Sequence, residues 1–276
     1  MEILKRNYPR YRCFFILSAL LILLLAGCAS PSRRIDEMAT GWGLANQKLQ
    51  GDGFELLVYR NRNTRPDKVL HVYLEGDGTP WITRSRVAED PTSRNPLALR
   101  LMALDPAPAL YLTRPCYNDS AQAHSCNPWL WTSGRYSETV VASMASALRN
   151  LIEAEAVKGI VLIGYSGGGV LAWLLAQRVP EVRTLVTIAA NLDIDRWTDR
   201  HGYSRLTSSL NPAAGPTMRQ GIEQWHLVGN TDTNVPPEII GALSKQLGPE
   251  ARVLRLPSDH HCCWLRLWPQ ILRQLD

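Results

Sequence analysis

The chain has 276 residues, of which 45% are hydrophobic, which is enough for one substantial core in one domain or at most two. The formal net charge is +5, but four basic residues against one acidic residue supply three of these charges before residue 28. Because the rest of the chain is close to balanced, we expect no nucleic-acid partner.

Residues 1–27 have the layout of a secretory signal peptide, with a basic start and an apolar run from residue 13 to residue 26. The run ends in Leu25-Ala26-Gly27-Cys28, which resembles the lipobox of bacterial lipoproteins. This resemblance implies cleavage before Cys28 and attachment of lipid to that cysteine. Ala29 follows it, which in Gram-negative bacteria directs a lipoprotein to the outer membrane. We therefore expect a lipid-anchored protein of the bacterial cell envelope, at the periplasmic face of the outer membrane. An uncleaved transmembrane anchor and an ordinary signal are the alternatives.

Residues 28–50 are interpreted as the lipidated N-terminus and a tether, and residues 51–276 as the folded domain. Residues 54–59 and 69–74 have the composition of strands. The second of these predicted strands ends in Glu75-Gly76-Asp77-Gly78, whose glycines let a ligand or another backbone segment approach closely.

A further strand is predicted at residues 109–113, and a polar loop containing Cys116 and Cys126 follows it. Two cysteines ten positions apart within one loop of an exported protein are best interpreted as a disulfide. A metal site formed by these cysteines and His124 is the alternative. Nothing else in the spacing supports it, so we predict no metal ion.

Residues 135–156 carry apolar side chains at helical spacing and lead directly to residues 160–163, an apolar run that predicts a buried strand. Strands that alternate with helices in this way predict βαβ units with parallel strands. The sheet is then covered by helices on both faces, and its chemistry is expected at the carboxyl ends of the strands.

Gly164-Tyr165-Ser166-Gly167-Gly168 must turn this strand into the helix that follows it. The pattern G-x-S-x-G between a strand and a helix predicts a nucleophile elbow, which presents the Ser166 hydroxyl beside the N-terminus of the helix. A glycine-rich loop that binds phosphate is the alternative. The glycine spacing does not fit the dinucleotide-binding fingerprint, however, and no lysine follows as in a P-loop.

A short strand is predicted at residues 185–190. Residues 194–221 then lose all periodic pattern, which predicts a cap-like excursion over the sheet that forms part of a pocket wall. His201 and Tyr203 lie in this segment and could touch substrate, and the other interpretation places them in solvent.

Asp232 follows a predicted strand at residues 225–229, and two adjacent histidines, His260 and His261, follow the last strand at residues 252–256. A serine hydroxyl needs a base to become a good nucleophile, and the imidazole needs a carboxylate to orient it. Ser166, Asp232 and His260 stand in the order that α/β sheets with a nucleophile elbow use. His261 is the alternative base, and Asp193 is the alternative acid.

From about Phe54 to the C-terminus the chain resembles the α/β-hydrolase superfamily, and within it a group of bacterial hydrolases that are often lipoproteins. The matching segments are E-G-D-G, G-Y-S-G-G-G, N-L-D, G-x-x-D-x-x-V-P-P and D-H-x-C-C-W. The resemblance implies the α/β-hydrolase fold, His260 as the base, and the N–H groups of Gly167 and Asp77 as the oxyanion hole. A glutamate stands where the family usually has a histidine in the oxyanion loop, so Gly76 and Gly78 are alternative donors.

These features predict a membrane-tethered serine hydrolase that cleaves a carboxylic ester or thioester of small-molecule size through an acyl-enzyme, without a metal or organic cofactor. The alternative is a catalytically silent envelope lipoprotein that uses the same fold to bind a ligand or a protein. A binding scaffold has no need of the full Ser, Asp and His set, which argues against this alternative. The pairing of Cys262 and Cys263, next to the expected base, stays open.

Overall fold

The computed structural model describes residues 30–64, 69–118, 124–241, 243, 246–249 and 251–275. The predicted signal peptide and the predicted lipidation site at Cys28 lie outside these residues. The chain from Pro31 to Asp276 forms one unit by itself. Within the described ranges, no helix combines the length and the apolar character needed to cross a membrane.

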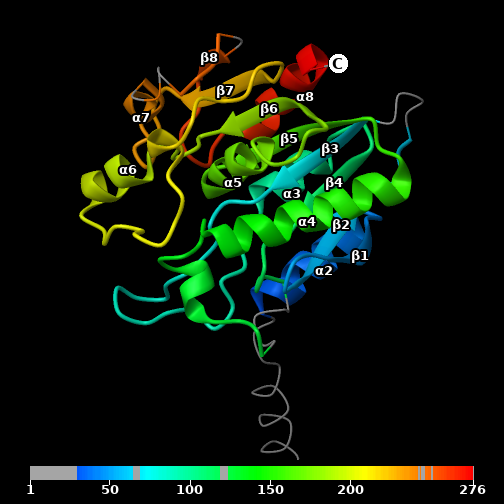
Figure 1. The fold of residues 1–276 in the computed structure, drawn as a ribbon, viewed down its shortest axis with the longest axis horizontal. Helices are drawn as coiled ribbons and strands as arrows, with labels where there is room; N and C mark the ends of the chain where they lie inside the picture. The colour runs from blue at the N-terminus through cyan, green and yellow to red at the C-terminus, as the bar shows by residue number, and fades with distance from the viewer. Residues whose placement is uncertain are drawn as a thin grey trace, which may run out of the picture. The chain divides into compact units, whose positions relative to one another are not determined.

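An eight-stranded sheet lies at the centre of this unit (Figure 1). In chain order its strands are β1 (Ala45–Gln50), β2 (Glu55–Arg60), β3 (Val69–Leu74), β4 (Ala109–Leu112), β5 (Gly159–Tyr165), β6 (Val182–Ile188), β7 (Glu223–Gly229) and β8 (Ala251–Leu256). Their order across the sheet is β1-β2-β4-β3-β5-β6-β7-β8. The pairs β1/β2 and β2/β4 are antiparallel, and all the remaining pairs are parallel. The carboxyl ends of the parallel strands therefore meet at one edge of the sheet.

Helices cover both faces of the sheet, and each face has its own apolar core. On one face lie α4 (Glu138–Glu155) and α5 (Gly167–Ala176), and on the other lie α2 (Pro31–Gly41), α3 (Leu97–Met102) and α8 (Trp264–Leu275). The strands between them are buried on both sides, which explains their continuous apolar runs. The shorter helices are η2 (Pro128–Trp131), α6 (Ile194–His201), η3 (Pro212–Ala214) and α7 (Pro237–Gly241).

The prediction that residues 28–50 form a tether is wrong from Pro31 onward. Helix α2 buries Ile35 and Ala39 in the core, and the Ser32 hydroxyl donates a hydrogen bond of 2.8 Å to the Asp90 carboxylate. Strand β1 then pairs with β2 along its whole length. Because β1 is an edge strand and none of its side chains is fully buried, its sequence shows no alternation of apolar and polar residues.

The predicted excursion after the strand near Ala190 consists of α6, η3 and the loops around them. Asp193 caps the N-terminus of α6, because its side chain accepts a hydrogen bond from the backbone N–H of Arg196 at 3.1 Å. The excursion follows β6, so it begins at the same edge of the sheet as the segment after β5.

Candidate active site

Ser166 stands between the last residue of β5 and the first residue of α5, in a conformation that few side chains adopt. Its φ is 51° and its ψ is −123°, and such strain at a non-glycine residue is typical of functional turns. The turn requires glycine on both sides. A Cβ atom at Gly164 would lie 2.3 Å from the carbonyl oxygen of Gly168, and one at Gly168 would lie 2.2 Å from that of Leu74.

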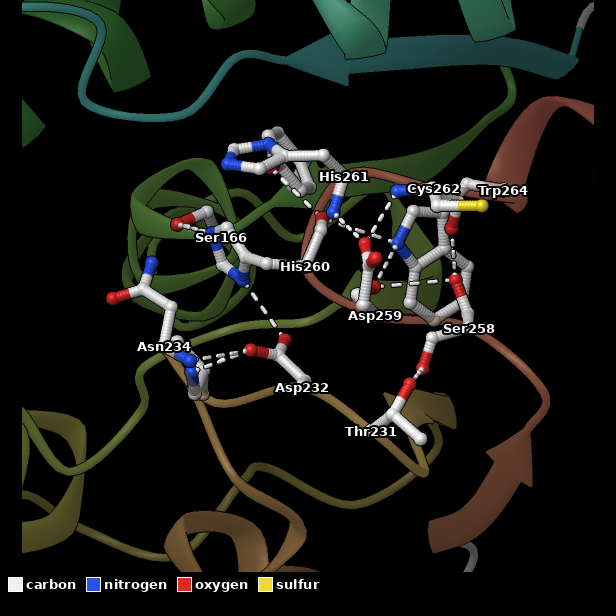
Figure 2. A network of polar contacts seen from close by, with 12 residues as sticks. Ser166, Thr231, Asp232, Asn234, Ser258, Asp259, His260, His261, Cys262 and Trp264 are labelled. Atoms are coloured by element: carbon white, nitrogen blue, oxygen red, sulfur yellow. Dashed lines mark hydrogen bonds and ion pairs between the residues drawn. The ribbon is translucent and has the colours of Figure 1, made fainter.

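A chain of hydrogen bonds connects Ser166 to a buried histidine and a buried carboxylate (Figure 2). The distance from Ser166 Oγ to His260 Nε2 is 3.1 Å, and that from His260 Nδ1 to Asp232 Oδ2 is 2.8 Å. The other oxygen of Asp232 accepts hydrogen bonds from the backbone N–H groups of Asn234 and Val235, at 2.9 and 2.7 Å. The carboxylate is therefore fixed in place, and it can orient the imidazole.

The alternative base, His261, and the alternative acid, Asp193, take no part in these hydrogen bonds. His261 Nδ1 lies 2.9 Å from the hydroxyl of Tyr165. Asp193 caps α6 instead of contacting a histidine. Among the predicted candidates, only His260 contacts Ser166, and only Asp232 contacts that histidine, as a Ser-His-Asp arrangement needs.

The loop that carries His260 is held by polar contacts at its backbone. The Tyr165 hydroxyl donates to the carbonyl oxygen of His260 at 3.0 Å, and the indole N–H of Trp264 donates to the same oxygen at 3.2 Å. The Asp259 carboxylate accepts two backbone N–H groups of the same loop, from residues 261 and 262, and these hydrogen bonds lower its pKa. The pairing of Cys262 and Cys263, which the sequence left open, is a disulfide between these two adjacent residues.

Asp77, predicted only as a backbone donor, has a side chain that is enclosed by three partners. Its carboxylate oxygens lie 2.8 Å from Arg114 Nη1, 2.9 Å from Arg135 Nη1 and 2.7 Å from the hydroxyl of Tyr136. The hydroxyl of Tyr117 donates to its carbonyl oxygen at 3.0 Å. Both ends of the residue are therefore fixed, and with them the backbone of the loop after β3.

This loop packs directly against the elbow. A Cβ atom at Gly167 would lie 2.0 Å from Asp77 Oδ1, so only glycine fits between the loop and the serine. As the first residue of α5, Gly167 has an N–H without an acceptor inside the helix. The N–H of Gly76 is engaged with the Glu75 side chain at 3.1 Å, which disfavours Gly76 as the second donor. The roles of Gly167 and Asp77 as oxyanion donors stay predictions.

The two carboxyl groups of this loop have pKa values that are shifted in opposite directions. Burial alone would raise the pKa of Asp77, but the charges of Arg135 and Arg114 and the Tyr136 hydrogen bond lower it to about 2. Burial raises the pKa of Glu75 to about 7, although backbone N–H groups at the start of α3 and in the loop donate to it.

Sequence reasoning missed Arg114, Arg135 and Tyr136 as parts of the site. The position of Arg114 carried a usable signal, because it follows β4 closely and β4 is the parallel neighbour of β3, which precedes Asp77. Arg135 and Tyr136 stand before α4, and no sequence pattern connects the start of that helix with the end of β3.

Ser166 and His260 line a cavity of about 1460 Å³. The predicted excursion contributes to its wall through Trp197, His201 and Tyr203, so both residues that could touch substrate face this cavity. The rings of His201 and Tyr203 stack at 5.2 Å between their centroids.

A disulfide joins Cys116 to Cys126 in the loop where one was predicted. The two sulfur atoms are bonded to each other and so cannot act as thiolate ligands. The alternative interpretation of this loop as a metal site with His124 therefore lacks two of its three ligands.

Several solved structures share this architecture. An esterase from Pyrococcus furiosus has 14% identity and a TM-score of 0.58, over 90% of this chain and 93% of that one. A putative α/β hydrolase from Agrobacterium tumefaciens has 15% identity and a TM-score of 0.53, over 84% and 95%. A bacterial membrane phospholipase A has 16% identity and a TM-score of 0.51, over 95% and 99%. No protein-family model and no curated protein matches the sequence. The chain thus has the α/β-hydrolase fold, and at these identities the likeness shows the fold alone.

Proposed function

We propose that this protein is a serine hydrolase that cleaves a carboxylic ester or thioester through a covalent acyl-enzyme. The observation that carries the proposal is the hydrogen-bonded chain from Ser166 Oγ through His260 to Asp232, next to a cavity large enough for a small-molecule substrate. The strained elbow supports it, because backbone strain at a non-glycine residue is typical of functional sites.

In the first half of the reaction Ser166 Oγ attacks the carbonyl carbon of the substrate while His260 Nε2 takes the hydroxyl proton. Asp232 keeps the imidazole oriented and stabilises its positive charge. The N–H groups of Gly167 and Asp77 donate to the oxygen on which negative charge develops. The bond to the leaving group then breaks, and His260 returns the proton to the leaving group.

In the second half a water molecule replaces the leaving group. His260 takes a proton from this water, whose oxygen attacks the acyl carbon, and the bond to Ser166 Oγ breaks as His260 returns the proton to Oγ. The products are a carboxylic acid, an alcohol or thiol, and the regenerated serine. Two of the structural neighbours are an esterase and a phospholipase A, which favours an ester over an amide as the substrate.

The proposal includes a lipid anchor at Cys28 and a location at the periplasmic face of the outer membrane. It rests on the lipobox-like segment Leu25-Ala26-Gly27-Cys28. The disulfide between Cys116 and Cys126 supports export, because disulfides persist in oxidising compartments such as the bacterial periplasm.

The test of the hydrolase proposal is turnover of p-nitrophenyl esters of increasing acyl length. We expect release of p-nitrophenol with a rapid first turnover when deacylation is slower than acylation, and an acyl length at which kcat/KM is highest. A folded protein that turns over none of these esters would contradict the proposal.

A further inference from the structure

Residues 80–88 form a hairpin beside the catalytic cavity. Its two arms meet in an antiparallel bridge between Trp81 and Val87, and the backbone N–H of Ala88 donates to the carbonyl oxygen of Pro80 at 2.9 Å. The hairpin contributes five residues to the wall of the cavity, and among them Trp81 and Ile82 are large and apolar while Arg84 is positively charged.

The wall of the cavity contains large apolar side chains that are open to solvent. On the hairpin, Trp81 is 43% exposed and Ile82 is 38% exposed. In the excursion, Tyr203 stands just after α6 and is 56% exposed. Scattered apolar residues on a surface are normal, but apolar residues that gather at a cavity with polar neighbours are typical of a binding site. These three side chains would offer an apolar surface to the hydrocarbon part of a ligand.

The same wall also carries arginines that make no ion pair with another described residue. Four arginines line the cavity, and two of them, Arg135 and Arg205, are paired with aspartates. Arg84 and Arg94 are exposed, and among the residues that the structure describes no carboxylate lies within ion-pair distance of either.

The acidic residues of the cavity wall do not balance these two arginines. Asp77 is bound by two guanidinium groups, those of Arg114 and Arg135, so this cluster has a surplus of positive charge. Glu75 is buried and accepts backbone N–H groups at both carboxyl oxygens. An anion that enters the cavity therefore meets unpaired cations and no opposing exposed carboxylate of the lining.

We propose that the substrate is an anionic amphiphile, namely a carboxylic ester that also carries a phosphate group, as a glycerophospholipid does. Arg84 and Arg94 bind the phosphate, and Trp81, Ile82 and Tyr203 contact the acyl chain. Guanidinium groups match phosphate oxygens with paired hydrogen bonds. Because Arg84 and Arg94 make no ion pair in the described structure, binding of the phosphate breaks none.

The reaction follows the proposed serine hydrolase function, on which this inference rests. The bond between the acyl carbon and the ester oxygen breaks, and the departing alcohol, which keeps the phosphate, takes the proton from His260. Water supplies the hydroxyl of the released fatty acid and the proton that regenerates the serine. The phosphate group keeps all of its bonds, so Arg84 and Arg94 act in binding and not in chemistry.

The experiment compares dihexanoylphosphatidylglycerol, kept below its critical micelle concentration, with the neutral ester p-nitrophenyl hexanoate. The measured quantity is the ratio of kcat/KM for the anionic ester to that for the neutral one. In the Arg84→Ala/Arg94→Ala variant we expect this ratio to fall roughly 10- to 100-fold, as for the loss of charged hydrogen bonds. Arg86→Ala is the matched control, because Arg86 is an exposed arginine of the same hairpin that does not line the cavity. We expect it to leave the ratio unchanged within about twofold.

A second experiment measures the binding of the anionic ester in the absence of turnover. Calorimetry with the Ser166→Ala variant should detect binding of dihexanoylphosphatidylglycerol, and the added removal of Arg84 and Arg94 should weaken it by a similar factor. An unchanged ratio and an unchanged affinity in the double-arginine variants would overturn the inference, as would an equal effect of Arg86→Ala. Turnover of p-nitrophenyl hexanoate separates the two proposals, since its absence contradicts the hydrolase function while the binding measurement still decides the anion site.

Discussion

Replacing Ser166 with alanine is expected to lower kcat/KM for p-nitrophenyl esters by roughly 10⁴-fold or more, because it removes the nucleophile and with it the acyl-enzyme. His260→Ala should lower it by a comparable factor, because the Ser166 hydroxyl then has no base at hydrogen-bond distance. The two changes remove parts of one unit, so the double variant should be about as active as either single variant. The measurement is steady-state kinetics of each variant with one ester.

His261→Ala is the control for this experiment. His261 is adjacent in sequence to the proposed base but contacts Tyr165 and not Ser166. We expect its loss to reduce the rate far less than the loss of His260. The assignment of the base would be wrong if His260→Ala kept its activity and His261→Ala did not.

Asp77→Asn is expected to lower the free energy of unfolding by about 3–5 kcal/mol, the usual cost of removing one partner of a buried ion pair. The change removes the negative charge between the buried Arg114 and Arg135, and both guanidinium groups then lose their counter-ion. Urea unfolding of the wild type and the variant measures the difference.

Asp199→Asn is the matched control for Asp77→Asn. It also removes a carboxylate from an arginine, but the Asp199–Arg205 pair is exposed and screened by solvent, so its loss should change the stability far less. A loss of stability as small for Asp77→Asn as for Asp199→Asn would contradict the role of Asp77.

The effect of Asp77→Asn should also depend on pH, with a sign that follows from the lowered pKa. Asp77 has a pKa of about 2 in the folded protein against an ordinary value of 3.8, so its ionised form stabilises the fold above pH 4. This contribution is lost as the pH falls from about 4 to about 2. The difference in unfolding free energy between wild type and variant should therefore shrink over that range.

The middle of the sheet could be predicted because strands such as β3 and β5 are buried on both faces and have continuous apolar runs, as at residues 160–163. The G-x-S-x-G pattern after β5 then predicted the start of the helix that follows this strand. Strand β1 could not be predicted in the same way. It lies at the edge of the sheet and is held by its pairing with β2, so its side chains carry almost no pattern.

The hydrogen bonds of His260 with Ser166 and with Asp232 could be predicted because all three residues follow parallel strands, whose carboxyl ends lie at one edge of the sheet. The cluster of Arg114, Arg135 and Tyr136 around the Asp77 carboxylate was not predicted. It joins the loops after β3 and β4 with the segment before α4, and its partners are more than 30 positions away from Asp77. Such a cluster depends on three-dimensional packing that local patterns do not encode.

The most direct test of the serine hydrolase proposal is labelling of the purified protein with a fluorophosphonate, followed by mass spectrometry of its peptides. Fluorophosphonates react with serine hydroxyl groups that a neighbouring histidine activates. We expect one modified residue, Ser166, and a strong loss of labelling in the His260→Ala variant. A folded protein that stays unmodified, or that is modified at another residue while Ser166 stays free, would contradict the account.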